Sequence, residues 1–316
     1  MNLGYKKFIR RFPIVSPLPF ETFASRQIWK WKLCSSYFGF YGAKEIDVKS
    51  NGNARIRLNK NTSLGKKGTT LEVPLDFAIY NTVRIFGEWS KEVSSFLSAG
   101  LIKTCDESVA KKSVLLDIGA NSGLITLQTL NMVRKKSIVI MFEPVANHRE
   151  AIEYNLRNII SKHEIVLNDF GLGEENVVTS LFREKKNKGN TSIFKSLVPV
   201  DSEEIFEIQI KDTKAYFANL PDFDSYIIKC DTQGMDSIIL SRIPEEIWKK
   251  VDRATIEIWA TEEVIEADVQ TLLGFWESSK YISWDSEMHE SVDLQELKKF
   301  WLGKTGEFRD LFITRI

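Results

Sequence analysis

The sequence predicts an α/β protein built on a mostly parallel sheet, and three observations support that fold class. From Ser113 onward, short apolar runs alternate with segments of helical spacing, which is typical of strand–helix–strand units. A glycine turn or an acidic residue follows several of these runs. The 316 residues are 43% hydrophobic and 27% charged, so the chain can bury a substantial core.

Residues 1–110 are expected to form an N-terminal extension in front of a sheet domain of residues 111–316. In residues 1–44, basic and aromatic residues are interleaved around the single acid Glu21. Prolines confine a helix there to about Glu21 to Tyr37. A packed helical arm with solvated lysines is the simpler interpretation. Peripheral contact with a membrane or an anionic partner through residues 1–44 is the alternative.

Residues 46–110 are expected to be a β-rich lead-in that covers the site or the edge of the sheet. A helix is predicted from Glu88 to Leu101. The expected extended segments are Ala54–Leu58, Thr70–Leu75 and Ala78–Ile85.

The sheet domain is expected to contain seven strands, of which the last two pair antiparallel. The strands are predicted at Ser113–Asp117, Ser137–Phe142, Glu164–Asn168, Ser225–Cys230, Arg253–Ile258, Tyr281–Trp284 and Asp310–Ile316. Helices are expected up to Met132, over Ala146–Ile160, Asp212–Ala218 and Glu262–Ser278, and from about Met235. The polar stretch Phe182–Lys195 is expected to be a mobile loop, and Glu207–Ile210 to be extended.

The stretch VLLDIGANSGLITLQ, Val114 to Gln128, predicts a buried strand, a tight turn with Gly119 and Gly123, and a helix. Glycines permit close ligand approach and positive φ angles, and a helix start carries free N–H groups and a positive dipole end. The spacing lacks the Gly-x-Gly-x-x-Gly dinucleotide fingerprint and a phosphate-binding Gly-Lys-Ser/Thr. A nucleoside ligand without a pyrophosphate is therefore favoured over NAD or ATP.

Three acidic residues, Asp117, Glu143 and Asp231, are expected at the carboxyl ends of three strands. Ligands of open α/β sheets bind at these ends, and Glu143 can accept hydrogen bonds from both hydroxyls of a ribose. A single acid after a strand is usually a helix cap. Three of them beside a glycine turn favour a binding site.

Four segments together resemble the FkbM family of S-adenosyl-L-methionine-dependent methyltransferases. They are DIGANSG (Asp117–Gly123), FEP (Phe142–Pro144), Asn155 in the next helix, and IIKCDTQGMD (Ile227–Asp236). The resemblance covers about residues 85–316 and implies a Rossmann-like class I methyltransferase fold. It also implies methyl transfer from S-adenosyl-L-methionine to a hydroxyl, most often on a sugar or a polyketide-like scaffold.

The resemblance assigns roles to named residues. Asp117, Gly119, Asn121 and Gly123 would bind the methionine end of the cofactor, Glu143 its ribose, and Asn168 or Asp169 would lie near the adenine. Asp231 is the candidate base or acceptor-orienting group with Lys229 behind it, and Glu257 and His148 are weaker candidates. The family has E-G-x-E where this chain has Gln233-Gly234-Met235-Asp236, so Gln233 loses a charge and a potential base or metal ligand.

Composition narrows the remaining choices. A formal net charge of zero argues against a general nucleic-acid binder. Scattered cysteines and histidines predict neither disulfides nor a zinc site, and a cytoplasmic location follows from the reducing environment that free thiols suit. Two acids, Asp231 and Asp236, are too few to predict an essential metal. The alternatives to a glycan O-methyltransferase are a catalytically weakened cofactor-binding protein and a membrane-associated accessory protein of a glycan pathway.

Overall fold

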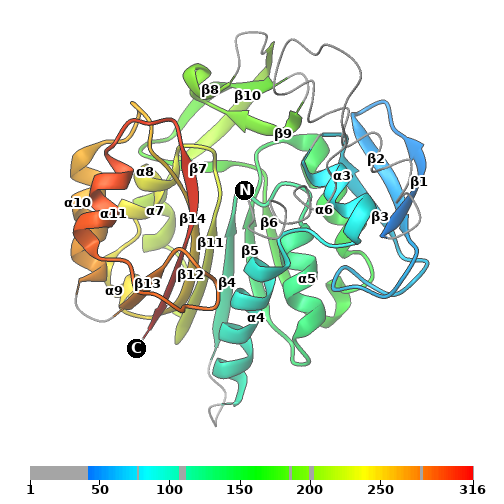
Figure 1. Cartoon of the computed structure of the whole chain (residues 1–316), viewed down its shortest axis with the longest axis horizontal. Coiled ribbons are helices and arrows are strands. Elements are labelled where there is room, and N and C mark those ends of the chain that lie inside the picture. The colour runs from blue at the N-terminus through cyan, green and yellow to red at the C-terminus, as the bar shows by residue number, and fades with distance from the viewer. Residues whose placement is uncertain are drawn as a thin grey trace, which may run out of the picture.

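The protein is described here from a computed structural model covering residues 42–76, 78–106, 112–184, 187–198, 203–277 and 280–315. The helix expected over Glu21–Tyr37 and almost all of the arm expected to contact a membrane lie outside these residues. A seven-stranded sheet forms the centre of the molecule (Figure 1). Its strands are β4 (Ser113–Ile118), β5 (Ile138–Phe142), β6 (Glu164–Asn168), β11 (Ser225–Cys230), β12 (Val251–Trp259), β13 (Lys280–Ser283) and β14 (Phe308–Arg315).

The strand order is β13-β14-β12-β11-β4-β5-β6. Every strand runs parallel to its neighbour except β14, which pairs antiparallel with both β12 and β13. This confirms the predicted Rossmann-like class I sheet with its antiparallel closing pair. Because β4 is central and the chain moves outward from it in both directions, β4 borders the topological switch point where such sheets bind ligands.

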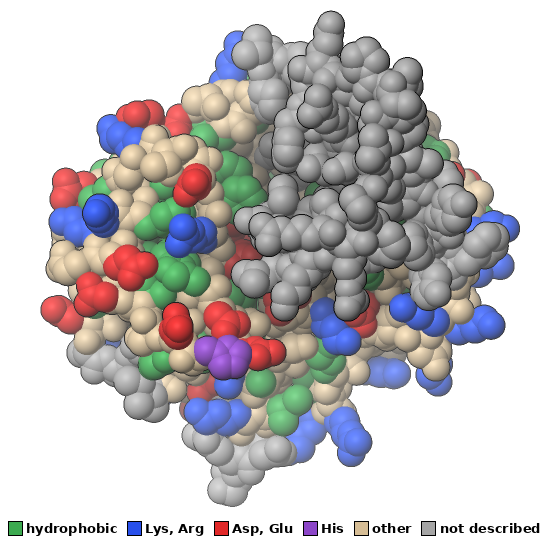
Figure 2. Space-filling view, viewed as in Figure 1, with side chains coloured by type: hydrophobic (Ala, Val, Ile, Leu, Met, Phe, Trp, Pro, Cys, Tyr) green, Lys and Arg blue, Asp and Glu red, His purple; other side chains and the backbone are tan. Residues whose placement is uncertain are grey.

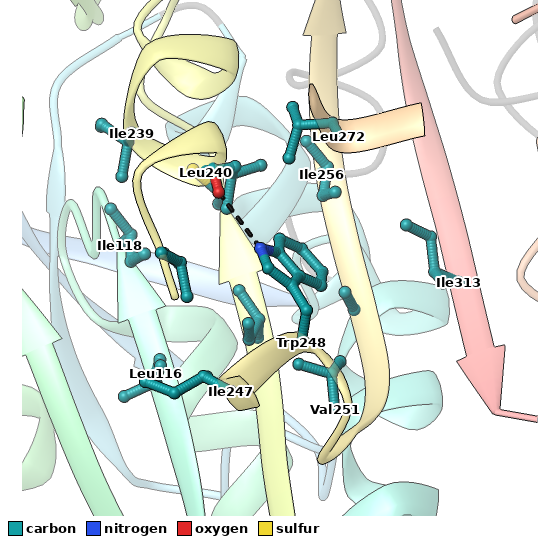
Figure 3. Close-up of a cluster of buried hydrophobic side chains, with 14 of the residues drawn as sticks. Leu116, Ile118, Ile239, Leu240, Ile247, Trp248, Val251, Ile256, Leu272 and Ile313 are labelled. Atoms are coloured by element: carbon teal, nitrogen blue, oxygen red, sulfur yellow. Dashed lines mark hydrogen bonds between the residues drawn. The ribbon is translucent and has the colours of Figure 1, made fainter. Parts of the chain in front are cut away.

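One face of the sheet is covered by α7 (Thr213–Ala218), α8 (Asp236–Ser241), α9 (Glu245–Trp248), α10 (Glu266–Trp276) and α11 (Leu294–Trp301). Trp248 is fully buried there, and its indole N–H donates a 3.1 Å hydrogen bond to the Leu240 carbonyl (Figure 3). A buried indole needs such a partner because an unpaired N–H in an apolar core is costly. The bond therefore fixes α9 against α8.

The opposite face is covered by α4 (Lys91–Asp106), α5 (Leu124–Met132) and α6 (Ala146–Leu156). The predicted helix over Glu88–Leu101 is confirmed as part of α4. A three-stranded antiparallel sheet of β1 (Ala43–Val48), β2 (Asn53–Leu58) and β3 (Thr70–Pro74) packs through β3 on α6. The described residues before 107 thus share one hydrophobic core with the central sheet.

The segment Ala78–Ile85 was expected to be extended, and that prediction is wrong. It forms α3 (Ile79–Phe86). The Asp76 carboxylate accepts hydrogen bonds from the N–H groups of Ile79 at 2.6 Å and Tyr80 at 3.3 Å, which satisfies two free donors of the first turn. Tyr80 and Val83 then face the core, so capping and burial together override the β-branched composition.

The mobile loop expected over Phe182–Lys195 is also wrong for the described part. β8 (Val177–Glu184) and β9 (Asn187–Ser192) pair with each other, and β8 pairs with β10 (Glu203–Asp212). With β7 (Gly171–Gly173) they form a four-stranded sheet of order β7-β10-β8-β9, at the top of Figure 1 beyond the carboxyl ends of the parallel strands. A second sheet therefore overhangs the predicted site.

No helix among the described residues is both long and apolar enough to cross a membrane. On the described part of the face in Figure 2, basic and acidic side chains mix at the left, and basic side chains predominate at the lower right.

Candidate functional site

The predicted glycine turn follows β4 and lies against the end of β11. Gly119 has φ +76°, and a Cβ there would come within 2.0 Å of the Asp231 carbonyl oxygen, so only glycine fits. Gly123, at φ +71°, begins α5 and lies close to Ile152. The turn after β4 is therefore in direct contact with the backbone of Asp231. The glycine turn and Asp231, which the sequence predicts to belong to one site, lie side by side.

Glu143, at the end of β5, is buried and binds this turn. Its Oε2 accepts a 2.7 Å hydrogen bond from the Asn121 N–H, and its Oε1 accepts one of 2.9 Å from the Val145 N–H. His148 Nδ1 lies 3.4 Å from the same Oε1. A carboxylate oxygen accepts more than one hydrogen bond, so Glu143 keeps acceptor capacity for a pair of hydroxyls.

The side chain of Asn121 fits a bound amino-acid ligand. Asn121 has φ +51°, and its Oδ1 is buried without a hydrogen-bond partner. A buried orphan acceptor costs free energy unless something satisfies it. The ammonium group of a methionine moiety would supply that donor, so the turn fits the cofactor assigned to it.

Asn155, on α6, fixes the turn from behind. Its Nδ2 donates to the carbonyls of Ser122 at 2.8 Å and Glu72 at 2.7 Å, and its Oδ1 accepts from the Glu72 N–H at 2.8 Å. The sequence singled out Asn155 only through the family resemblance. Its role here is to tie the turn after β4 to β3.

Asp117 and Lys229 form a buried ion pair under the turn. They are register partners on β4 and β11, with 3.3 Å between Lys229 Nζ and Asp117 Oδ1. Thr126 donates a 2.6 Å hydrogen bond to Asp117 Oδ2, and Lys229 donates to the Gly119 carbonyl. Burial alone would lower the pKa of Lys229, but the charges of Asp117 and Asp231 outweigh it and raise that pKa above its usual range. Lys229 is therefore a fixed cation and no proton acceptor.

Asp231 follows β11 with its side chain 43% exposed. Its Oδ1 accepts a 3.1 Å hydrogen bond from Gln233 Nε2, which also donates to Glu257 Oε2 at 2.7 Å. Burial first, and then the charge of Asp231, raise the pKa of Glu257 well above its usual range. Glu257 therefore favours its neutral form.

Asp236 begins α8 and closes the same loop. Its two oxygens accept hydrogen bonds from the N–H groups of Thr232 and Gly234, at 3.1 and 3.2 Å. Burial and the neighbouring Asp231 raise the pKa of Asp236 to about 6. Asp236 therefore shapes the loop through these two hydrogen bonds. Among the described residues, no group of three or more His, Cys, Asp or Glu side chains is arranged to hold a metal ion.

The two residues predicted near the adenine differ in their surroundings. Asn168, at the end of β6, donates from Nδ2 to the Met141 carbonyl at 3.1 Å and lies 3.4 Å from the Tyr216 hydroxyl. Asp169 is exposed. Phe142, Phe170 and Tyr216 pack edge to face beside Asn168. Sequence patterns did not single out this aromatic cluster or Trp259, whose Nε1 donates to Glu257 Oε2 at 2.6 Å.

Comparisons with known proteins give only distant structural likenesses. No family model and no curated protein matches the chain. A SAM-dependent methyltransferase from Agrobacterium tumefaciens is 10% identical (TM-score 0.38), covering 96% of this chain and 81% of its own. Methyltransferase FkbM from Methylobacillus flagellatus is 17% identical (TM-score 0.35), covering 69% of this chain and 47% of its own.

A protein from Pyrococcus horikoshii, provisionally titled an RNA methyltransferase, is 14% identical (TM-score 0.33), covering 70% of this chain and 81% of its own. At these scores the likenesses decide neither the family nor the acceptor, so they lend no support to the expectation that nucleic acid is excluded. The sheet order and the turn after β4 make S-adenosyl-L-methionine the expected cofactor.

Proposed function

We propose that this protein is an S-adenosyl-L-methionine-dependent O-methyltransferase of the FkbM type whose acceptor is a hydroxyl of a sugar or glycoconjugate. One observation carries the proposal. A buried carboxylate, Glu143, is held by the N–H of Asn121 in the glycine turn at adjoining carboxyl strand ends. This arrangement supports a role for Glu143 in binding the ribose of the cofactor, beside a turn that would hold its methionine moiety.

The cofactor, when bound, supplies an electrophilic methyl group on a sulfonium. The residues of this chain would hold the acceptor oxygen in line with that methyl, and positioning of this kind contributes roughly 7–11 kcal/mol. Asp231, exposed at the end of β11, would accept the hydroxyl proton. Lys229 and Asp117 neutralise each other beneath the turn, so they fix its shape without adding net charge.

Cofactor binding tests the first half of the proposal. Isothermal titration should show binding by the wild type and at least tenfold weaker binding by Glu143→Ala, because the ribose loses its acceptor. Glu164→Ala, an exposed change at the start of β6, is the matched control and should bind normally. Equal affinity of wild type and Glu143→Ala would refute the ribose assignment.

Turnover tests the second half. With a panel of glycans and glycoconjugates, release of S-adenosylhomocysteine should be lost by about 10²–10⁴-fold in Asp231→Asn, while cofactor affinity stays the same. Asp222→Asn, at an exposed carboxylate before β11, should leave turnover unchanged. Binding without product on every acceptor would favour the alternative, a catalytically weakened cofactor-binding protein.

A further inference from the structure

Gln233 lies between two acidic side chains and donates to both, an arrangement that the proposed activity does not by itself require. We propose that Gln233 is a positioning residue: its amide orients the Asp231 carboxylate so that one oxygen of Asp231 is free to take the acceptor proton. This inference rests on the proposed function, because it gives Asp231 a role in transfer.

The contacts of Gln233 fix its amide from several sides. Nε2 lies 3.1 Å from Asp231 Oδ1 and 2.7 Å from Glu257 Oε2. Trp259 Nε1 donates to the same Glu257 oxygen, which anchors the far end of the bridge on β12. An amide NH₂ has two donors, and both are used here on two separate carboxyl groups.

The backbone of Gln233 is also held in place. Its φ is +55°, a region that non-glycine residues enter at a cost. Ser192, at the end of β9, donates a 2.8 Å hydrogen bond from its hydroxyl to the Gln233 carbonyl. The overhanging sheet therefore fixes the loop in the conformation that points the amide between Asp231 and Glu257.

The bridge leaves the two oxygens of Asp231 in different states. Oδ1 accepts from Gln233, whereas Oδ2 lies 3.9 Å from Lys229 Nζ, which is too far for a hydrogen bond. The bound cofactor would supply the methyl group: the acceptor oxygen would bond to the methyl carbon, the carbon–sulfur bond would break to give a neutral thioether, and Asp231 Oδ2 would take the hydroxyl proton. Charge and atoms balance without a further reactant.

A glutamate at position 233 would reverse this arrangement. It has almost the same shape but no donor, so Asp231 and Glu257 would face a third carboxyl group instead of a shared N–H donor. Asp236, Asp310, Cys230 and Lys229 are ionisable groups that also act on this cluster. Like charges in one site favour proton uptake, and a divalent cation would relieve their repulsion.

The test compares wild type with Gln233→Glu, Gln233→Ala and the control Gln209→Glu, which adds the same charge at an exposed position of β10. With an acceptor from the glycan panel, we expect kcat of Gln233→Glu to fall at least tenfold with the KM for cofactor within twofold. The acid limb of its pH–rate profile should move to higher pH. If Gln233 only braces the loop, Gln233→Glu should lower the melting temperature and leave the acid limb of the pH–rate profile where it is in the wild type. That result would overturn the proposal.

A second measurement does not depend on turnover. Carboxyl ¹³C NMR titrations should show the cluster taking up protons at higher pH in Gln233→Glu than in wild type, and its melting temperature should rise with added Mg²⁺ or Ca²⁺ more than that of Gln209→Glu. Unchanged titrations would overturn the inference whether or not methyl transfer is found. The wild type could instead bind the cofactor without transferring its methyl group, while the titrations shift as expected. That result would refute the proposed methyl transfer and leave the role of Gln233 in the cluster standing.

Discussion

Lys229 is a buried cation that holds the turn of the candidate site. It is 7% exposed, pairs with Asp117, and donates to the Gly119 carbonyl in the turn. A charge removed from water is tolerated only with close partners. Lys229 therefore holds the turn against the end of β11, and we expect its substitution to lower the free energy of unfolding of the protein.

Lys229→Met should destabilise the protein by about 3–5 kcal/mol, because Asp117 would be left buried and unpaired. Guanidinium denaturation measures this free energy of unfolding. The double variant with Asp117→Asn should recover part of the loss, since the orphan charge is then gone. A double variant as unstable as the sum of the two single changes would show that the pair is not coupled.

At the scale of elements, Asp76 sets where α3 begins. Burial raises the pKa of Asp76 from 3.8 to about 7, and this outweighs the N–H groups of Tyr80 and Ile79, which lower it. The folded state thus binds the Asp76 proton more tightly than the unfolded state does. The stability from that proton is fully present below about pH 4 and is lost as pH rises towards 7.

Asp76→Asn keeps an oxygen for the cap but cannot titrate. The wild type should lose stability between pH 4 and 7 by up to roughly 1.4 kcal/mol per pH unit from this group, and the variant should lose that slope. Urea denaturation at several pH values measures it. Asp293→Asn, which changes the exposed cap of α11, is the control and should keep the wild-type slope. An unchanged slope in Asp76→Asn would contradict the assignment.

The sequence predicted most of the central strands but missed one helix and one hairpin. The five parallel strands were predicted because short apolar runs that alternate with segments of helical spacing are a local signal. The helix over Ala78–Ile85 was missed because its β-branched composition favours a strand, and the burial of the helix under the lead-in sheet depends on tertiary contacts. Its cap, Asp76, is a local signal that the prediction did not use. The hairpin in Phe182–Lys195 was missed because its polar strands are stabilised by pairing with β10, far along the sequence.

For the site, the sequence predicted which residues lie at the strand ends, but not which other residues of the protein they contact. Glu143 and the turn are in contact as the spacing suggested. Asp117 and Lys229 face each other because their strands are in register, which sequence spacing cannot reveal. The sequence indicates only that Gln233 lacks the charge of the glutamate in the family pattern, while the structure shows its amide donating hydrogen bonds to two carboxyl groups.

At the scale of the whole molecule, the predicted boundary at residue 110 crosses a continuous core. Phe96, Leu97 and Leu101 of α4 are buried with Leu115 of β4 and Ile227 of β11. Removal of α4 would expose the central strands to water. The structural unit therefore includes the described part of the extension.

A fragment of residues 111–316 should fail to fold cooperatively, whereas a chain that starts at residue 42 should melt in one transition like the full chain. The reason is that burial of a core face contributes about 25 cal/mol per Å² of apolar surface, and the fragment loses that cover. Circular dichroism melts and amide hydrogen exchange measure both. A well-folded 111–316 fragment would support the boundary at residue 110 instead.

The position of β14 between β12 and β13 has a consequence for the order of assembly. β13 precedes β14 in the chain, yet in the sheet β13 pairs only with β14. β13 can therefore join the sheet only after the later strand β14 has been synthesised and links it to β12. Such non-local closure is slow, and until it occurs β12 offers a bare hydrogen-bonding edge that a second unfinished chain could occupy.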